Sequence, residues 1–227
     1  MSEFYARFSP DPEFPDERMM WVTDKPVLKD FVAEFAVYDP DFLSYRLPKG
    51  KPYPLEPSGT AAHIASDEVG VFLFEWSDEA AALQQAGWEY LIANAGVVDS
   101  ALKQKLRSIQ AKCLALHEEE IEGAGFLVKH WAKIQAQLRS GAEEAIDQFY
   151  KLVGISLAAS GLDESCWIGF EFQTAWDKDH GLEVVVHKDK VYAAGGMTEL
   201  LSPNFPVADS IRSVQEYELD PGDCKLD

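Results

Sequence analysis

The sequence has few cysteines and no long apolar run. Its 3 cysteines, Cys113, Cys166 and Cys224, stand far apart and form no CxxC pair. An odd number at wide spacing predicts free thiols in a reducing compartment, and neither a disulfide framework nor a zinc site. No apolar run approaches the roughly 18 residues that a membrane helix needs, and MSEFYARFSPDPEF lacks the basic and apolar regions of a secretory leader. We therefore expect a soluble cytoplasmic protein without membrane contact.

Common catalytic motifs are also missing. The sequence has no GxSxG, no Walker loop and no GxGxxG, so nothing in it supports a hydrolase, nucleotide or dinucleotide site. The run HEEEIE at residues 117–122 contains metal-type ligands, but it lacks the HExxH spacing. Mostly consecutive glutamates are typical of a solvated helix face. We predict no cofactor, no metal and no catalytic residue.

Basic residues are scarce relative to acidic ones. The chain has 20 Lys and Arg against 39 Asp and Glu, which gives a formal net charge of −19 at pH 7. Such a surface repels phosphate groups, so direct binding of DNA or RNA is disfavoured. It attracts basic proteins or cations and speeds association with them. General solubility is the alternative explanation of the same charge.

The pattern along the chain predicts one α+β domain over residues 1–227. Its parts are a strand- and loop-rich region (1–76), a helical region (77–158), a β-meander (162–196) and a tail (197–227). We expect an antiparallel sheet, formed by N-terminal strands and the C-terminal meander, that packs against about four central helices.

The N-terminal region is the least regular. Residues 1–26 are rich in Pro and acid, which predicts an extended arm or loop. Residues 27–39 fit both a strand and a helix. Four prolines and two glycines in residues 47–59 indicate a long irregular loop. Residues 62–76 end in a β-rich apolar run that predicts a buried strand.

Helical spacing of apolar residues begins after Ser77, a residue suited to an N-cap and followed by two acids. A second helix is predicted from Asp99 or Ser100. Residues 127–138, after Gly123 and Gly125, form a third helix or the continuation of one bent helix. A fourth is predicted after Ser140, which begins a capping-box spacing. The apolar positions of these helices are Leu83, Trp88, Leu91 and Ile92; Leu102, Leu106, Ile109, Cys113 and Leu116; Leu127, Trp131, Ile134 and Leu138; and Ile146, Phe149, Tyr150 and Val153.

After Gly161 the apolar period changes to two. Residues 168–174 alternate apolar and other side chains, as strands with one buried face do, and Leu182, Val184 and Val186 share one face of a second strand. Residues 188–190 form a polar turn, and 191–194 are a third short strand. This order predicts an antiparallel meander.

The segment between the first two of these strands, WDKDHG, concentrates polar groups. As a catalytic site, Asp177 or Asp179 would orient His180 as a general base. As a metal site, two carboxylates and an imidazole are suitable ligands. As a structural turn, Asp177 would bond to backbone amides, Gly181 would adopt a positive φ, and Trp176 would anchor the strand end. We favour the structural turn, and a binding surface is the next interpretation.

The segment IGFEFQTAWDKDHGLEVVVHKDKVYAAGG resembles the C-terminal signature of a family of bacterial domains of unknown function. The family's pattern is an apolar strand, Trp-Asp-x-Glu-His-Gly-Leu-Gly, a short strand, a turn and Val-x-x-x-Gly. Asp179 stands where that pattern has Glu, and Glu183 where it has Gly. The resemblance implies an accessory or immunity-type protein of a toxin locus, and it assigns no catalytic residue. The matching residues are Trp176, Asp177, His180, Gly181 and Leu182.

Charge, motifs and resemblance together predict a non-enzymatic, acidic protein-binding module. It would be of immunity type and would neutralise a basic protein such as a toxin domain, with residues 176–181 as the candidate binding segment. Trp21, Tyr53 and Trp76 stand near loop ends, where a binding surface could use them, although core packing absorbs most aromatic residues. The alternative is a small-molecule- or metal-dependent enzyme that uses the same loop.

Overall fold

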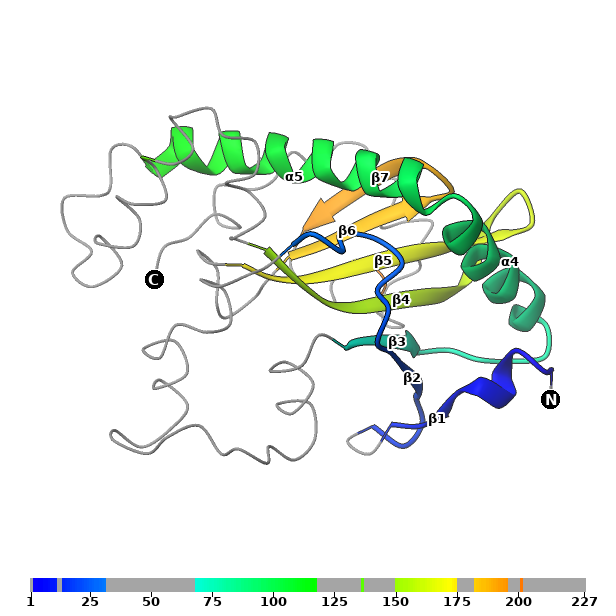
Figure 1. Cartoon of the computed structure of the whole chain (residues 1–227). Helices are drawn as coiled ribbons and strands as arrows, with labels where there is room; N and C mark the ends of the chain where they lie inside the picture. Colours follow the sequence, from blue (N-terminus) through cyan, green and yellow to red (C-terminus); the bar gives the residue numbers. More distant parts are fainter. Residues whose placement is uncertain are drawn as a thin grey trace, which may run out of the picture.

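A seven-stranded mixed sheet organises the part of the chain that the structure describes. The computed structural model describes residues 2–11, 14–31, 68–117, 136, 150–174, 182–195 and 201. The strands lie side by side in chain order (Figure 1). They are β1 (Ser9–Pro10), β2 (Arg18–Val22), β3 (Val69–Leu73), β4 (Tyr150–Leu162), β5 (Ser165–Thr174), β6 (Leu182–His187) and β7 (Lys190–Gly195). The helices are the 3-10 helix η1 (Tyr5–Arg7) and the α-helices α4 (Ala80–Ala93) and α5 (Ala95–His117).

One pair of neighbouring strands, β3 and β4, is parallel. Residues 70–72 pair with residues 154–156, whereas the other neighbouring strands of the sheet pair antiparallel. Parallel neighbours need a crossover connection, which usually contains a helix. Here the chain between β3 and β4 contains α4 and α5, and these contact β4, β5 and β7 (Figure 1).

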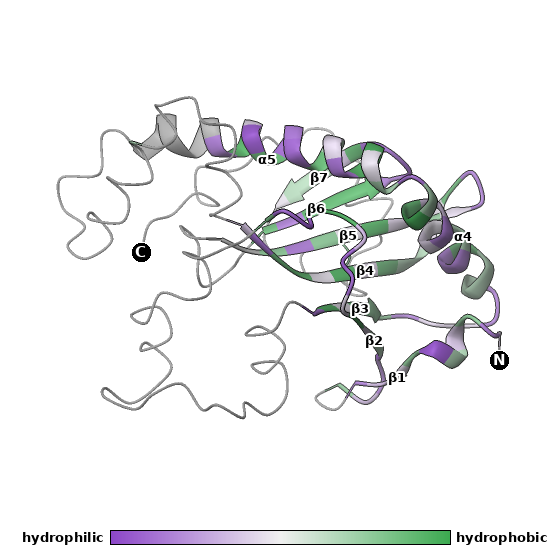
Figure 2. Ribbon diagram, in the orientation of Figure 1, coloured by the Kyte–Doolittle hydropathy of each residue, from purple (hydrophilic) through white to green (hydrophobic). Residues whose placement is uncertain are grey.

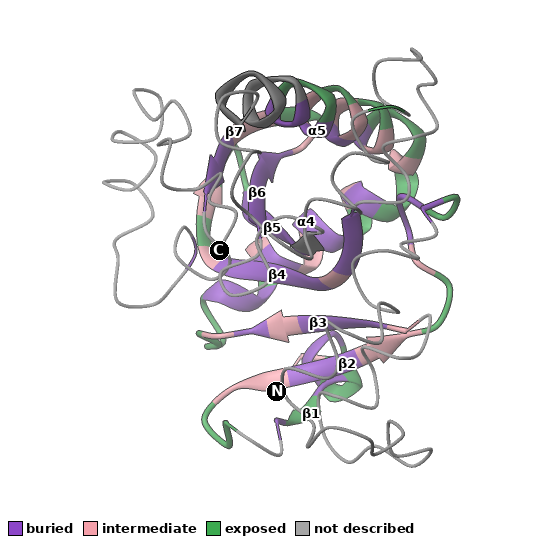
Figure 3. Cartoon of the chain, turned by 90° about the vertical axis from the view of Figure 1, so that its left-hand side faces the viewer, coloured by how far each residue is buried: buried purple, intermediate pink, exposed green. Residues whose placement is uncertain are grey.

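The hydrophobic core lies between these helices and one face of the sheet. Along β5, Ile168, Phe170 and Phe172 are buried in it, as the period of two predicts. Strands β4 to β7 curve beneath α5 when seen from the side (Figure 3). Hydrophilic residues run along α5 while β6 and β7 are mostly hydrophobic (Figure 2), so α5 is covered by the sheet on one side only.

Helix α4 begins close to the predicted start, whereas α5 begins at Ala95, before the predicted start at Asp99 or Ser100. The Ser77 hydroxyl accepts a hydrogen bond of 3.1 Å from the Ala80 amide at the start of α4. The stripe predicted for α5 is buried at Leu102, Leu106 and Ile109. In α4, Ile92 is 50% exposed, so its place in the predicted stripe was wrong. No helix among the described residues is long and apolar enough to cross a membrane.

The expected fold class was wrong in two respects. The sheet is mixed, and the described ranges hold two α-helices where about four were expected. The fourth helix would have included Tyr150 and Val153, but these residues belong to β4. In the run YKLVGISL the apolar residues satisfy helical and strand spacing alike, and pairing with β3 and β5 decides for the strand. Apart from Ala136, the expected helix at 127–138 lies outside the described residues.

The N-terminal prediction also needs correction. The expected arm at 1–26 contains η1, β1 and β2, and Phe4 and Tyr5 are buried in the core. Within 27–39 no helix or strand forms as far as Phe31, where the description ends. The expected loop at 47–59 lies outside the described residues, as does the tail from 197 except Leu201.

The strand predicted at the end of residues 62–76 is β3. Further along, β5, β6 and β7 run antiparallel in chain order, which is the arrangement expected of the meander. At the polar turn between β6 and β7, His187 pairs with Lys190, and Lys188 has a φ of 56°. A two-residue hairpin turn takes positive φ values readily because their twist matches that of the strands.

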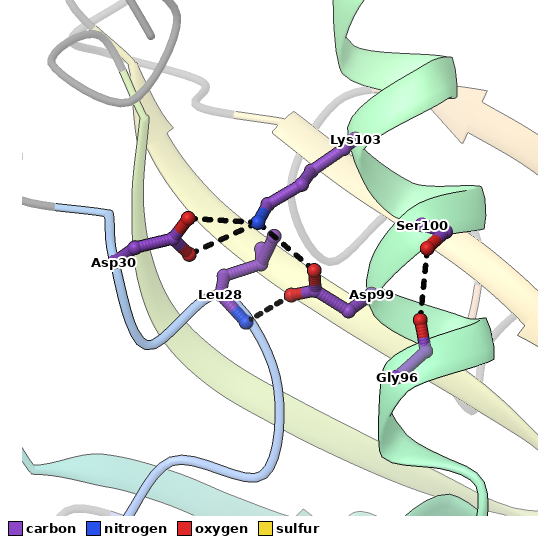
Figure 4. A network of polar contacts seen from close by, with 6 residues as sticks. All are labelled: Leu28, Asp30, Gly96, Asp99, Ser100 and Lys103. Atoms are coloured by element: carbon purple, nitrogen blue, oxygen red, sulfur yellow. Dashed lines mark hydrogen bonds and ion pairs between the residues drawn. The ribbon is translucent and has the colours of Figure 1, made fainter.

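An ion network, which we call the Lys103 network, fastens residues 27–31 onto α5 (Figure 4). The Lys103 ammonium lies 3.0 and 2.9 Å from the two Asp30 carboxylate oxygens and 2.9 Å from Asp99 Oδ2. Asp99 Oδ1 accepts a hydrogen bond of 2.6 Å from the Leu28 amide. Leu28 is fully buried and has a φ of 54°, a conformation that L-residues adopt only when their surroundings impose it. The network therefore supports a strained residue of the core.

Replacing Lys103 with Met should lower the free energy of unfolding by about 0.5–1 kcal/mol at neutral pH, the usual range for partly exposed ion pairs. The hydrogen bond from Lys103 holds the pKa of Asp30 below its ordinary value, although burial opposes it. A depressed carboxyl pKa stabilises the fold above the unfolded pKa, and this stabilisation disappears as pH falls through the folded pKa. Urea denaturation at neutral and at acid pH should thus show the difference shrinking in acid.

Lys29→Met is the matched control for this measurement. Lys29 and Asp24 form an ion pair of 2.6 Å in which both side chains are largely exposed. Its loss should change stability little. A loss in Lys103→Met no larger than that in Lys29→Met would contradict the anchoring role of the Lys103 network.

Candidate functional site

The loop that carries the predicted site residues connects β5 to β6. These strands are antiparallel neighbours, and Phe172 pairs with Leu182 at the end nearest the loop. Residues 175–181, and with them Trp176, Asp177, Asp179, His180 and Gly181, lie outside the described residues. A structural turn at this place stays a prediction, since only the strands on either side are described.

Next to this loop, the outer face of the sheet carries two buried glutamates. We use "outer face" for the side opposite α4 and α5. Glu171 on β5 pairs directly with Glu183 on β6, and the two residues are 7% and 0% exposed. Directly opposed residues of neighbouring strands point to the same side, so both carboxylates lie on this face. Sequence reasoning did not select either residue as part of a site.

Glycines of the sheet provide the space for these carboxylates. A Cβ atom added to Gly154 of β4 would lie 2.5 Å from Glu171 Oε2. A Cβ added to Gly169 of β5 would meet Glu183 Oε1 and would lie 2.8 Å from a methyl carbon of Leu201. The glutamate side chains therefore lie over glycines. An isolated glycine inside a strand was the signal that could have located this pair.

The chemistry of Glu171 follows from its burial. Desolvation raises the pKa of the Glu171 carboxyl, the negative charge of Glu17 raises it further, and the hydrogen bond from Ser156 opposes the change. The Ser156 hydroxyl donates to Glu171 Oε1 at 2.5 Å. A buried carboxyl of raised pKa beside a second carboxyl is typical of acid–base chemistry. In this protein both are buried, so the described geometry favours a role inside the fold.

Glu171→Gln should raise the thermal midpoint at neutral pH and change it little in acid. The folded pKa of Glu171 lies above its unfolded value, so the cost of ionising the buried carboxyl grows as pH rises from about 4.5 toward the folded pKa. Gln stays neutral and its carbonyl accepts the Ser156 hydrogen bond. Calorimetric melts across the pH range would test this, and a less stable variant at neutral pH would show that the ionised form is favoured.

Gly154→Ala should destabilise the protein by about 1–3 kcal/mol, because the added methyl group overlaps the Glu171 carboxylate. In the Glu171→Ala background the same change should cost less by at least about 0.5 kcal/mol, the coupling expected of residues in contact. Denaturant unfolding of the four proteins, which are the parent, the two single variants and the double variant, measures this coupling.

Gly96→Ala in α5 is the control: its Cβ would meet nothing within 4 Å, so Ala should stabilise the helix. Equal costs of Gly154→Ala in both backgrounds would contradict the contact.

The other end of the outer face carries a group of aromatic rings. The Trp167 ring lies 5.1 Å from His187 and 4.9 Å from Tyr192, measured between ring centroids. His187 is buried, and its Nε2 lies 2.7 Å from the Leu162 carbonyl oxygen, which requires that this nitrogen donate its proton. These contacts make His187 a structural residue that joins β6 to the end of β4.

A second surface of interest lies at the end of the sheet formed by β1, β2 and β3, and we call it the Trp76 surface. It consists of the exposed residues Phe14, Asp16, Glu75, Trp76, Asp78 and Glu79. Phe14 and Asp16 belong to the connection from β1 to β2, and the other four follow β3. The Trp76 indole donates a hydrogen bond of 3.2 Å to the Asp16 carbonyl oxygen, which joins the two segments.

The Cys166 thiol is a further reactive group of the described part. Burial raises the pKa of the Cys166 thiol to about 12, so it stays protonated at neutral pH. Its sulfur fills the space beside Gly87 in α4. Among the described residues no three His, Cys, Asp or Glu side chains are grouped to hold a metal ion. His117 ends α5, and the acidic residues after it lie outside the described residues.

The described elements define an α+β protein whose mixed sheet is covered by two helices on one face and carries a buried glutamate pair on the other. Residues 68–201, more than half of the chain, match the family "Domain of unknown function (DUF6985)", and the chain belongs to this family. The match confirms the coarser expectation from the sequence, that the chain belongs to a family of domains of unknown function. The match begins one residue before β3, so η1, β1 and β2 precede it. No curated protein and no solved structure matches the chain.

Proposed function

We propose that this protein is a non-enzymatic binding protein of the cytoplasm whose partner is a basic protein. A net charge of −19 is the observation that carries the proposal. A charge of this size creates a potential that draws in and orients a basic partner before contact. Charge alone also serves solubility, so a defined acidic contact surface adds weight to the proposal, and the Trp76 surface provides one.

The biological role that fits best is immunity to a toxin. Neutralising a basic toxin domain requires tight and fast association, and opposite charge favours the speed of association. The resemblance of residues 168–196 to domains found at toxin loci supports this role. The loop 176–181 is a candidate part of the contact, beside its role as a connection between β5 and β6.

Co-purification with the product of the adjacent gene tests the proposal. A basic partner should be retained at physiological salt, and retention should weaken as salt rises because the attraction between exposed charges is screened over about 8 Å. Co-expression should restore growth to cells that produce the partner alone. Adjacent genes that encode only housekeeping enzymes, together with no basic protein retained, would contradict the proposal.

The alternative of an enzyme that uses the loop 176–181 draws on one observation. Glu171 and Glu183 lie opposite each other close to the strand ends that carry the loop, and the pKa of Glu171 is raised by burial. Thermal melts over a panel of metabolites and divalent cations distinguish the two functions, because a bound ligand raises the midpoint. A rise that Glu171→Gln abolishes would favour the enzyme.

A further inference from the structure

We propose that the Trp76 surface is the docking site for an arginine-bearing segment of the basic partner. This inference rests on the proposed function and adds the place of contact and the side chain that is recognised. The Trp76 surface combines exposed aromatic rings with carboxylates, the two groups that bind a guanidinium well.

The Trp76 surface exposes two aromatic side chains. Phe14 is 59% exposed and Trp76 is 39% exposed, and both are among the few large apolar side chains exposed in the described part. Exposed aromatic residues mark interaction sites, where they supply much of the binding energy, and the indole of Trp76 is bonded to Asp16, two residues after Phe14. Four exposed acidic residues of the described part stand within three positions of Phe14 or Trp76 in the sequence, and their carboxylates make the surface negative. They are Asp16, Glu75, Asp78 and Glu79.

The surface is held in place by buried bonds beneath it. The Tyr5 hydroxyl lies 2.6 Å from Gln84 Oε1 and 2.8 Å from the Ser77 carbonyl oxygen. The Gln84 amide nitrogen in turn donates to the carbonyl oxygens of Glu75 and Leu157. Residues 75–77 are thus tied to η1, α4 and β4 at once. A surface fixed in this way loses little conformational freedom when a partner binds.

The chain's own Arg18 indicates which cation the surface accepts. Its guanidinium carbon lies 4.4 Å from the centre of the Trp76 ring, an intramolecular cation–π contact. The Tyr5 ring meets Trp76 edge-on, with centroids 6.1 Å apart. A guanidinium stacks on aromatic faces and pairs with carboxylates in a fork, which an ammonium does less well. A partner arginine would therefore take the position of Arg18 on the indole and pair with the neighbouring carboxylates.

The probe for this inference is a fluorescently labelled octa-arginine peptide, with octa-lysine and octa-glutamate for comparison. Fluorescence anisotropy at physiological salt measures the dissociation constants. Octa-arginine should bind more tightly than octa-lysine, and octa-glutamate should not bind. Trp76→Ala should weaken octa-arginine binding about fivefold, the loss expected of one cation–π contact, while Trp76→Phe should retain part of the affinity.

Two double variants separate local from overall charge. Glu75→Lys with Asp78→Lys changes the Trp76 surface, and Glu89→Lys with Asp189→Lys makes the same change of charge on α4 and on the turn between β6 and β7. The first should weaken binding on the order of tenfold and the second no more than about twofold, because charges beyond a screening length of about 8 Å contribute little.

The role of Arg18 has its own matched pair of variants. Arg18→Gln removes the intramolecular competitor and should strengthen octa-arginine binding. Lys190→Gln makes the same change of charge at another cation–π contact, where the ammonium lies 4.6 Å from the Tyr192 ring centre. That variant should leave the affinity within about twofold of the parent, since it lies outside the Trp76 surface. Circular dichroism melts confirm that each variant is folded.

The outcomes separate the two levels of the proposal. Tight octa-arginine binding that is lost equally in both double variants, and unchanged in Trp76→Ala, would overturn the docking site and leave the basic partner in place. No binding of octa-arginine at physiological salt would overturn the proposed function and the docking site together. Octa-arginine binding that weakens in Trp76→Ala and in the Glu75→Lys, Asp78→Lys variant, and strengthens in Arg18→Gln, supports both the docking site and the proposed function.

Discussion

The parallel pairing of β3 with β4 is the constraint on which the rest of the described structure depends. Parallel neighbours cannot be joined by a hairpin, so the chain leaves the sheet after Leu73 and returns at Tyr150. The crossover brings α4 and α5 onto one face, where they bury Leu102, Leu106 and the inner side chains of β4 to β6. The same pairing leaves β2 and β1 beyond β3, which brings Asp16 beside Trp76 in the segment that follows β3.

Local patterns in the sequence predicted the elements whose partners are close in the chain. The alternation in β5, the apolar run of β6 and the polar turn at Lys188 were sufficient for the meander, and the steps of three and four from Leu102 were sufficient for α5. The failures occurred where distant segments decide. Tyr150 to Leu157 satisfies both periods, and only pairing with β3 and β5 makes it a strand. Likewise β2 is stabilised by β3, which follows it after an intervening long segment.

The sites were less predictable than the elements, because they depend on register between strands. Nothing local in the sequence places Glu171 opposite Glu183, although Gly154 and Gly169 hinted at close approach within a strand. Trp76 was recognised as an aromatic residue near a loop end, but its neighbour Asp16 is 60 positions away in the sequence. Residues 176–181 were legible by composition, and composition alone does not distinguish a turn from a binding loop.

The order of the strands has a consequence for how the protein assembles. Strands β4 to β7 pair through short connections, whereas β3 joins β4 only after the long crossover has closed, a step that costs chain entropy before any contact forms. We therefore expect the meander to form early and to expose the free edge of β4 until β3 docks. An unpaired edge is a template for aggregation. Strands β1 to β3 emerge first during synthesis but complete the sheet last. By docking on β4, a strand made long after them, they protect its edge.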